Sequence, residues 1–181
     1  MKENLFEKVE LKNGESFYLI EKTNLKTNIV KTTSSSFKIK RIPDVLGSAS
    51  IILTKDFEYI GHISSIIYKD KTAALYMNEI RNVNFPNELS YVNLEDKALV
   101  VDEKYRGQGK SKELIYLMLS YLASKGITQL YVNGITDEIA MKTYLGTGAS
   151  QLTDTTAVYS ELHIILQSAV FDQLFGEYPK R

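Results

Sequence analysis

The loop Arg106–Ser111, which reads Arg-Gly-Gln-Gly-Lys-Ser, is the stretch of this sequence whose residue types point most clearly to chemistry. Gly107 and Gly109 have no Cβ atom, so an anion can come close to the backbone around them. Arg106 and Lys110 add positive charge on either side of the glycines. The loop is therefore predicted to bind a phosphate or a pyrophosphate.

The segments on both sides of this loop can position it. The apolar run Ala98–Val101 predicts a short buried strand before the loop. After the loop, apolar residues recur at the spacing of a helix that packs on a sheet, and Lys125 and Gly126 are typical of its C-terminus. A strand that enters a helix in this way directs several backbone N–H groups and the positive end of the helix dipole at one spot. The apolar stripe consists of Leu114, Leu117, Met118, Tyr121 and Leu122.

Two common phosphate loops are excluded by counting. A Walker A loop would need a glycine five places before Gly109, where the sequence has Lys104. A dinucleotide fingerprint that starts at Gly107 would need a glycine at Lys112. The pattern that remains is Arg106-x-x-Gly109-x-Ser111.

A second motif follows the next predicted strand, Thr128–Asn133. Asp137 can cap a short helix over Glu138–Leu145. Ala140 and Tyr144 stand four places apart on one face of that helix. The pair Gly148-Ala149 comes directly afterwards.

These two motifs, in this order and with one strand between them, resemble the GNAT acyl-CoA N-acyltransferases. The loop pattern of that family is Q/R-x-x-G-x-G/A, and Ser111 stands at its last place. The family also has A-x-x-x-Y followed by a glycine and an aromatic residue, where this chain has Ala149. The resemblance covers about residues 49–166. It implies an α/β (α+β) fold with a mixed, mainly antiparallel twisted sheet, helices on both faces, and a parallel strand pair splayed around the acyl-CoA site.

The resemblance also implies acetyl-CoA as a cosubstrate and direct transfer of its acetyl group to a primary amine in a ternary complex. Backbone groups of Leu99 and Val101 would pair with the pantetheine arm and steady the acyl carbonyl. The loop would hold the pyrophosphate through Arg106, Gly107, Gln108, Gly109, Lys110 and Ser111.

Tyr144 is the implied general acid that protonates the leaving thiolate. A thiol has a pKa of about 8.5 and tyrosine one of about 10, so the proton transfer is uphill by about 2 kcal/mol. We expect a nearby helix N-terminus to lower the pKa of Tyr144 and so to correct this difference.

The amine acceptor must lose a proton before it attacks, because a lysine-like amine has a pKa of about 10.4. Glu95, six places before Val101, resembles in its placement the glutamate base of histone-type family members. Glu79, acting through water, is the alternative. His62 could face the same cleft, although a single histidine in a strand is usually structural.

Other functions stay open at this point. A non-catalytic acyl-CoA-binding or regulatory module would keep the donor loop and lack turnover. The departures at Ser111 and Ala149, together with a strand-rich N-terminal part where the family has a strand and two helices, are compatible with it. A nucleotide-binding protein is disfavoured by the failed Walker A count.

The rest of the chain is expected to add strands and one more helix. A hairpin is predicted over residues 5–22, around a two-residue Asn13-Gly14 turn. Strands are predicted over 48–55, 58–68 with Gly61 as a bulge, 72–83 and 157–166. The strand 128–133 should run parallel to the strand that ends near Asp102, because a helix crosses over between them. Ser168 can cap a last helix whose apolar stripe, Phe171, Leu174 and Phe175, covers the core or forms a homodimer contact.

The composition of the 181 residues fits a single domain over 1–181. The formal net charge is zero, with 22 basic and 22 acidic residues, so nucleic acid and membrane surfaces are not expected partners. With no cysteine and two histidines, His62 and His163, no metal site is expected. The N-terminus has no long apolar stretch, so a cytoplasmic location is expected. The resemblance to the GNAT family implies a small-molecule or peptide amine as the partner.

Overall fold

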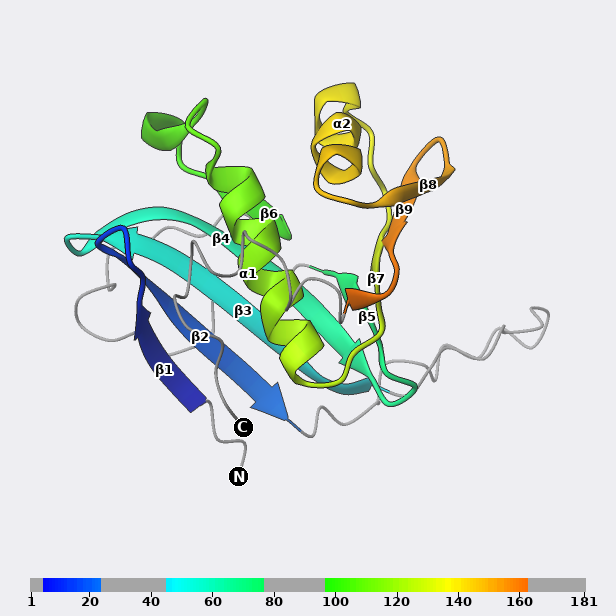
Figure 1. Cartoon of the computed structure of the whole chain (residues 1–181), viewed down its shortest axis with the longest axis horizontal. Helices are drawn as coiled ribbons and strands as arrows, with labels where there is room; N and C mark the ends of the chain where they lie inside the picture. Colours follow the sequence, from blue (N-terminus) through cyan, green and yellow to red (C-terminus); the bar gives the residue numbers. More distant parts are fainter. Residues whose placement is uncertain (1–4, 24–44, 77–96, 163–181) are drawn as a thin grey trace.

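The computed structural model describes residues 5–23, 45–76 and 97–162, which form a strongly twisted nine-stranded sheet with helices packed against it (Figure 1). The strand order is β1-β2-β3-β4-β5-β7-β9-β8, and β6 pairs with β4 beside this path. The elements are β1 (Leu5–Glu10), β2 (Glu15–Thr23), β3 (Val45–Lys55), β4 (Glu58–Tyr68), β5 (Thr72–Leu75), β6 (Leu99–Val101), α1 (Lys110–Ser124), β7 (Gln129–Val132), α2 (Glu138–Gly146), β8 (Ser150–Thr153) and β9 (Thr156–Tyr159).

The first four strands form an antiparallel meander. The pairings β1–β2 and β3–β4 agree with the predicted strands, whereas the pairing of β2 with β3 was not predicted. The turn between β1 and β2 differs in its length, because Leu11 donates to the Glu15 carbonyl at 2.8 Å and leaves a three-residue loop. Gly14 closes this loop with a φ of 82°, the left-handed conformation that such loops require. The Asn13 side chain accepts a hydrogen bond from the Glu15 N–H at 3.0 Å and so helps to fix the turn.

The two faces of β4 are both buried but meet different surroundings. Ile63 and Ile67 belong to the core cluster that α1 covers with Leu114, Ile115 and Met118. The alternate residues, His62 and Ser64, point to the opposite face and are also fully buried. Figure 1 shows that α1 lies across one face of the sheet, over β3 and β4. The amphipathic pattern of α1 is therefore explained by one apolar stripe against one face of the sheet.

The predicted bulge at Gly61 is confirmed. The register shifts between Leu53 and Thr54 and leaves Ile60 as the extra residue of β4. A Cβ atom at Gly61 would lie 2.4 Å from the Val100 carbonyl oxygen. Glycine at this place therefore allows β6 to approach β4.

β5 and β6 lie end to end along the same edge of β4. The Tyr76 N–H donates to the Ser64 carbonyl at 3.1 Å, and the Ser64 N–H donates to the Ala98 carbonyl at 2.8 Å. β5 and β6 thus occupy one strand position beside β4, with Tyr76 at the end of the first piece and Lys97 before the second.

The parallel partner of β7 differs from the prediction. β7 runs in the same direction as β6 but pairs with β5, through Thr72↔Gln129 and Ala74↔Tyr131. The physical reason is the length of the crossover, because α1 carries the chain back by about 22 Å and so past β6. In the part of the chain that the structure describes, β6 pairs with β4 alone, so its other edge is open.

The C-terminal part of the described chain adds α2 and the β8–β9 hairpin. β9 pairs with β7 and forms only the first part of the predicted final strand 157–166, because residues 160–162 are not in a strand and 163–166 lie outside the described residues. β8 is an exposed edge strand that the sequence did not predict. The predicted helix after Ser168 and the outer part of the predicted strand 72–83 lie outside the described residues. The predicted fold class is confirmed, with a mixed, mainly antiparallel sheet and a parallel pair. Neither described helix is long and apolar enough to cross a membrane.

Candidate active site

The loop between β6 and α1 presents a row of unpaired backbone N–H groups. A short 3₁₀ turn over Glu103–Tyr105 ends at Arg106, and Gly107 and Gly109 then take φ values of 76° and 74°. The first hydrogen bond that enters the helix is from the Glu113 N–H to the Gly109 carbonyl, at 3.2 Å. No described residue accepts a hydrogen bond from the N–H groups of residues 107–112. Free backbone N–H groups at the start of a helix are an arrangement that can donate hydrogen bonds to an anion.

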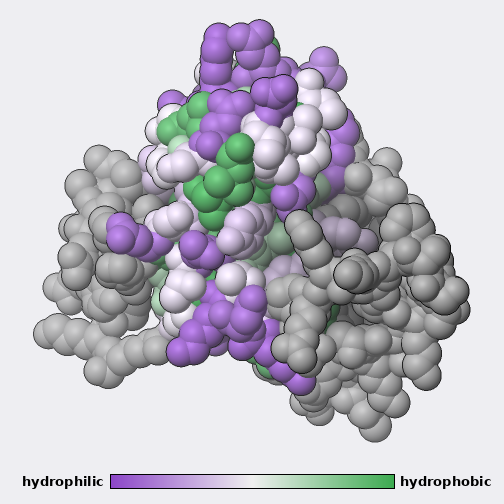
Figure 2. Space-filling view, turned by 90° about the vertical axis from the view of Figure 1, so that its right-hand side faces the viewer, coloured by the Kyte–Doolittle hydropathy of each residue, from purple (hydrophilic) through white to green (hydrophobic). Residues whose placement is uncertain are grey.

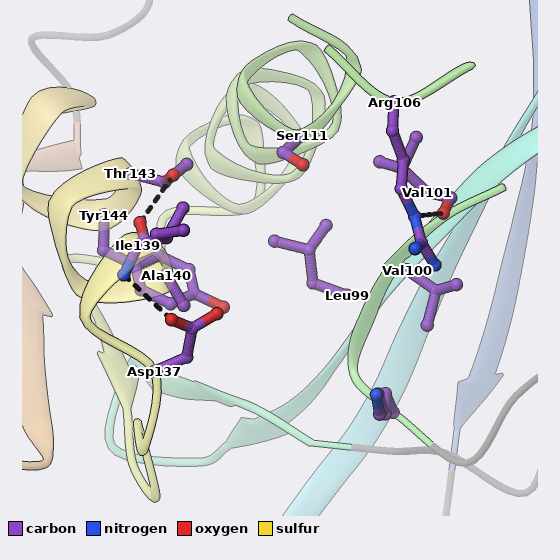
Figure 3. Close-up of a pocket in the computed structure, with 11 residues that line it drawn as sticks. Leu99, Val100, Val101, Arg106, Ser111, Asp137, Ile139, Ala140, Thr143 and Tyr144 are labelled. Carbon is purple, nitrogen blue, oxygen red and sulfur yellow. Dashed lines mark hydrogen bonds between the residues drawn. The ribbon is translucent and has the colours of Figure 1, made fainter. Parts of the chain in front are cut away.

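A groove extends from this loop along β6 to α2. A cavity of about 290 Å³ lies at the loop, and a cavity of about 340 Å³ lies beside β6. The two cavities share five lining residues, so they adjoin and form one groove. Figure 3 shows β6 and Arg106 on one side, α2 on the other, and the start of α1 between them. The shared lining residues are Val101, Arg106, Ser111, Ile139 and Thr143.

The open edge of β6 turns backbone hydrogen-bonding groups toward this groove. Ala98 accepts from Ser64, and Asp102 donates to the Ile60 carbonyl at 2.8 Å, so these two residues direct their backbone groups at β4. Backbone groups alternate in direction along an antiparallel strand. Those of Leu99 and Val101 therefore face away from β4, toward the groove that both residues line.

Arg106 spans the two parts of the groove. Its Nε donates to the Val101 carbonyl at 3.2 Å, which holds the exposed side chain along the loop (Figure 3). No described residue contacts the remaining guanidinium N–H groups in an ion pair or a hydrogen bond. They are the charged donors that the loop offers to an anion.

Lys110 and Gln108 contribute less through their side chains than the sequence suggested. The Lys110 ammonium contacts the buried Glu15 carboxylate and lies 3.2 Å from Glu113. The Gln108 side chain donates to the Lys104 carbonyl at 3.5 Å and is absent from the groove lining. What both residues present to the loop is the backbone N–H.

Glu15, Lys110 and Glu113 form a partly buried charge cluster behind the loop. Burial and the neighbouring Glu15 carboxylate raise the pKa of Glu113 to about 7. Burial opposes ionisation of Glu15 as well, but hydrogen bonds from Glu113 and Lys110 lower its pKa. The Asn13 side chain donates to Glu113 at 3.3 Å, so the cluster ties the first hairpin to the start of α1.

Glu113 should make the stability of the protein fall as the pH rises. Between the ordinary carboxyl pKa of 4.5 and the folded value of about 7, the folded state holds a proton that the unfolded state has lost. Each unit of this shift corresponds to about 1.4 kcal/mol, and each kcal/mol to about 2–4 °C in Tm for a chain of this length. We expect Glu113→Gln to match the wild type near pH 5 and to melt several degrees higher at pH 8.

Thermal melts of both proteins from pH 5 to pH 8 measure this difference. Glu138→Gln is the matched control, because Glu138 lies exposed on α2 and its one ion pair with a described residue is to Lys142, at 3.5 Å. A Tm difference between Glu113→Gln and the wild type that does not change with pH would contradict the assignment.

Tyr144 projects from α2 toward the groove. Tyr144 is 9% exposed, and its hydroxyl points into the space beside Asp137 (Figure 3). No described residue forms a hydrogen bond with this hydroxyl. The Tyr144 carbonyl accepts from the Ala149 N–H at 3.1 Å and from the Thr147 hydroxyl at 2.9 Å, which fixes the end of α2. The expected lowering of its pKa is wrong. Burial raises the pKa of Tyr144, which lies near the C-terminal end of its own helix.

The groove also contains residues that sequence reasoning did not assign to it. Ile139 and Thr143 line both cavities, and Asp137 and Lys97 line the inner one. Among the described lining residues, Asp137 carries the sole carboxylate, and it also caps α2 by accepting from the Ile139 N–H at 2.9 Å. Helical spacing from Ala140 and Tyr144, extended by one turn, would have found the positions on and before α2. Lys97 precedes β6, and no motif pointed to it.

The side of the molecule that carries α2 and β8 has exposed apolar surface between hydrophilic margins (Figure 2). Ile139 is 73% exposed and faces the groove from α2. Ser111, on the opposite wall, lines both cavities, and its hydroxyl has no partner among the described residues. The groove therefore has apolar surface on the α2 side, at Ile139, and a polar hydroxyl on the opposite wall, at Ser111. Glu95 and Glu79 lie outside the described residues, so their predicted role as base stays a prediction.

Comparisons with known proteins give structural similarities. No protein-family model matches the sequence, and no curated protein matches it. A GNAT-family acetyltransferase from Staphylococcus aureus has a TM-score of 0.45 at 16% identity, over 62% of this chain and 67% of that one. The PaiA N-acetyltransferase from Thermoplasma acidophilum, in complex with coenzyme A, has a TM-score of 0.46 at 16% identity, over 65% and 61%. An IAA acetyltransferase from Bacillus cereus has a TM-score of 0.45 at 12% sequence identity, over 62% of this chain and 77% of that one.

Proposed function

We propose that this chain is an acyl-CoA-dependent N-acyltransferase of the GNAT type, with acetyl-CoA as donor and a primary amine as acceptor. The observation that carries the proposal is the row of unpaired N–H groups at residues 107–112, next to the open edge of β6. The groove then continues to the hydroxyl of Tyr144. A diphosphate, an amide-bearing arm and a reacting thioester would meet these three features in that order.

The loop has enough donors to bind a diphosphate. One exposed helix terminus contributes only about 0.3–1 kcal/mol per charge. Hydrogen bonds to charged groups contribute about 1.5–3 kcal/mol each, so several N–H groups and the Arg106 guanidinium together supply a useful affinity. Beyond the loop, the outward backbone groups of Leu99 and the N–H of Val101 can pair with the amides of the pantetheine arm, while the Val101 carbonyl accepts from Arg106.

The donor supplies an activated thioester carbonyl and a thiolate leaving group. In the proposed step the amine nitrogen bonds to that carbonyl carbon, the carbon–sulfur bond breaks, and Tyr144 gives its hydroxyl proton to the sulfur. The low-dielectric site that raises the pKa of Tyr144 would also raise that of a thiol beside it. The raised pKa of Tyr144 is therefore compatible with general-acid catalysis when the thiol is buried in the same site.

Removal of the amine proton requires a basic group near the acceptor. Glu95 remains the proposed base, with Glu79 acting through water as the alternative. Asp137 is the carboxylate that the described groove itself offers, and its charge can attract a cationic amine toward Tyr144.

A non-catalytic acyl-CoA-binding module is the second candidate. The raised pKa of Tyr144 favours it, because a tyrosine that resists ionisation can also serve only to pack α2. Both candidates share the donor loop and differ in turnover alone.

The test has two stages. Calorimetry should show micromolar-scale binding of acetyl-CoA and CoA, and no comparable binding of ATP. Thiol release from acetyl-CoA with a panel of small amines and peptides then separates the candidates. Release that depends on the amine supports the enzyme, binding without release supports the module, and the absence of CoA binding contradicts both.

A further inference from the structure

His62 is hydrogen-bonded at both ring nitrogens, and the bond at Nε2 places a proton there. The side chain is fully buried on β4, with Nδ1 2.6 Å from the Tyr59 hydroxyl and Nε2 2.9 Å from the Lys97 carbonyl oxygen. A carbonyl oxygen can only accept a hydrogen bond, so Nε2 carries the proton and donates. In the neutral ring Nδ1 then accepts from Tyr59. The imidazole thus connects the edge of β4 to the point where the chain returns to the sheet.

The Lys97 carbonyl needs such a partner because the ladder of β6 ends there. β6 has three residues, and His62 lies opposite Val100 in its register. Beyond Ala98 the ladder cannot continue on β4, since the Ser64 carbonyl already accepts from the N–H of Tyr76. A side chain therefore takes over the contact that another strand residue would make.

This contact lies directly before the groove. Lys97 and Leu99 both line the cavity beside β6, and the outward backbone groups of Leu99 and Val101 are the ones assigned to the donor arm. A three-residue strand held by one neighbour has few bonds to keep it in place. Any shift of its first residue would move those outward groups.

We propose that His62 is a positioning residue of the donor site, which holds the Lys97 carbonyl and thereby fixes the edge of β6 that binds the acyl-CoA arm. This inference rests on the proposed function, because it assigns His62 to the same groove. His62 does not touch the donor or the acceptor in this role. It acts through the Lys97 carbonyl.

Two substitutions at His62 separate positioning from packing. Glutamine places an amide N–H near the position of Nε2, so His62→Gln can keep the bond to Lys97. Asparagine is one methylene shorter and can meet only Tyr59. We expect His62→Asn to weaken CoA binding and to raise the KM for acetyl-CoA by about tenfold, and His62→Gln to stay within about threefold of the wild type. The KM for the amine and kcat should change little in both.

Ser64→Ala is the control for loss of a buried polar contact on the same face. Ser64 is as deeply buried as His62, and its hydroxyl bonds to that of Ser50 at 2.9 Å, away from Lys97. This variant should leave CoA binding unchanged. Equal impairment of His62→Gln and His62→Asn, or unchanged CoA binding in His62→Asn, would overturn the inference.

Hydrogen exchange without any ligand makes the outcome independent of the proposed function. The Val100 and Asp102 amides of the β6 segment, which face β4, should exchange about tenfold faster in His62→Asn than in the wild type or in His62→Gln. Unchanged exchange in His62→Asn contradicts the positioning role. If the wild type shows this protection but binds no CoA, the proposed function fails while the structural role of His62 is retained.

Discussion

Replacement of Tyr144 by phenylalanine should lower kcat by about a hundredfold or more and leave the KM for acetyl-CoA within about threefold. The substitution removes one hydroxyl that has no partner among the described residues, so the packing of α2 is kept. A general acid acts on the departing sulfur and contributes little to binding of the donor. Steady-state rates of thiol release at several donor concentrations measure the two constants separately.

Tyr131→Phe is the matched control for this experiment. Tyr131 lies on β7, its hydroxyl donates to Gln129 at 3.0 Å on the same strand, and it does not line the groove. Its loss should leave both constants near those of the wild type. An unchanged kcat in Tyr144→Phe would show that the hydroxyl gives no proton in the rate-limiting step, and the assignment of the acid would be wrong.

Arg106→Glu should weaken the binding of CoA by about a hundredfold. The change removes the charged donors next to the row of N–H groups and places a negative charge beside the diphosphate. A charge-assisted hydrogen bond contributes about 1.5–3 kcal/mol, and each 1.4 kcal/mol is a factor of ten in affinity. Calorimetric titration with CoA measures the loss, which should shrink as salt is added because the side chain is exposed.

Lys142→Glu carries the same change of charge on α2, outside the groove lining. Lys142 is exposed and pairs with Glu138 at 3.5 Å. This variant should bind CoA nearly as the wild type does. Equal losses in the two variants would mean that overall charge, and not the position of Arg106, controls the affinity.

Much of the sheet was predictable because its signals are local. Glu58–Tyr68 was predicted with the bounds that β4 has, and the hairpin around Gly14 was predicted from its turn residues. The bulge at Gly61 followed from a single glycine inside a strand pattern. The start of α1 followed from the loop and the apolar stripe after it. Each of these features depends on residues close together in the chain.

The features that the sequence did not reveal depend on long-range pairing. All four residues of β8 are exposed, so its sequence carries no apolar alternation from which the strand could be predicted. That β7 pairs with β5 is decided by how far α1 carries the chain, which no local pattern contains. The joining of β5 and β6 along β4 becomes visible only through Ser64, which bonds to both.

The candidate site shows the same division. The glycine loop and Tyr144, which both line the groove, were picked out from motifs, because each motif lies within one loop or about one turn of helix. The partner of Lys110 could not be found, since Glu15 is far away in sequence and approaches only through the hairpin. The direction of the pKa of Tyr144 depends on burial in the assembled groove, which a motif does not describe.

The central claim is that the backbone amides of residues 107–112 cradle a diphosphate. An NMR titration of the isotope-labelled protein with CoA, followed at each backbone amide, tests it most directly. We expect saturable shifts concentrated at these amides, with smaller ones at Leu99 and Val101. CoA that binds and leaves these amides unmoved, or fails to bind at millimolar concentration, would contradict the account.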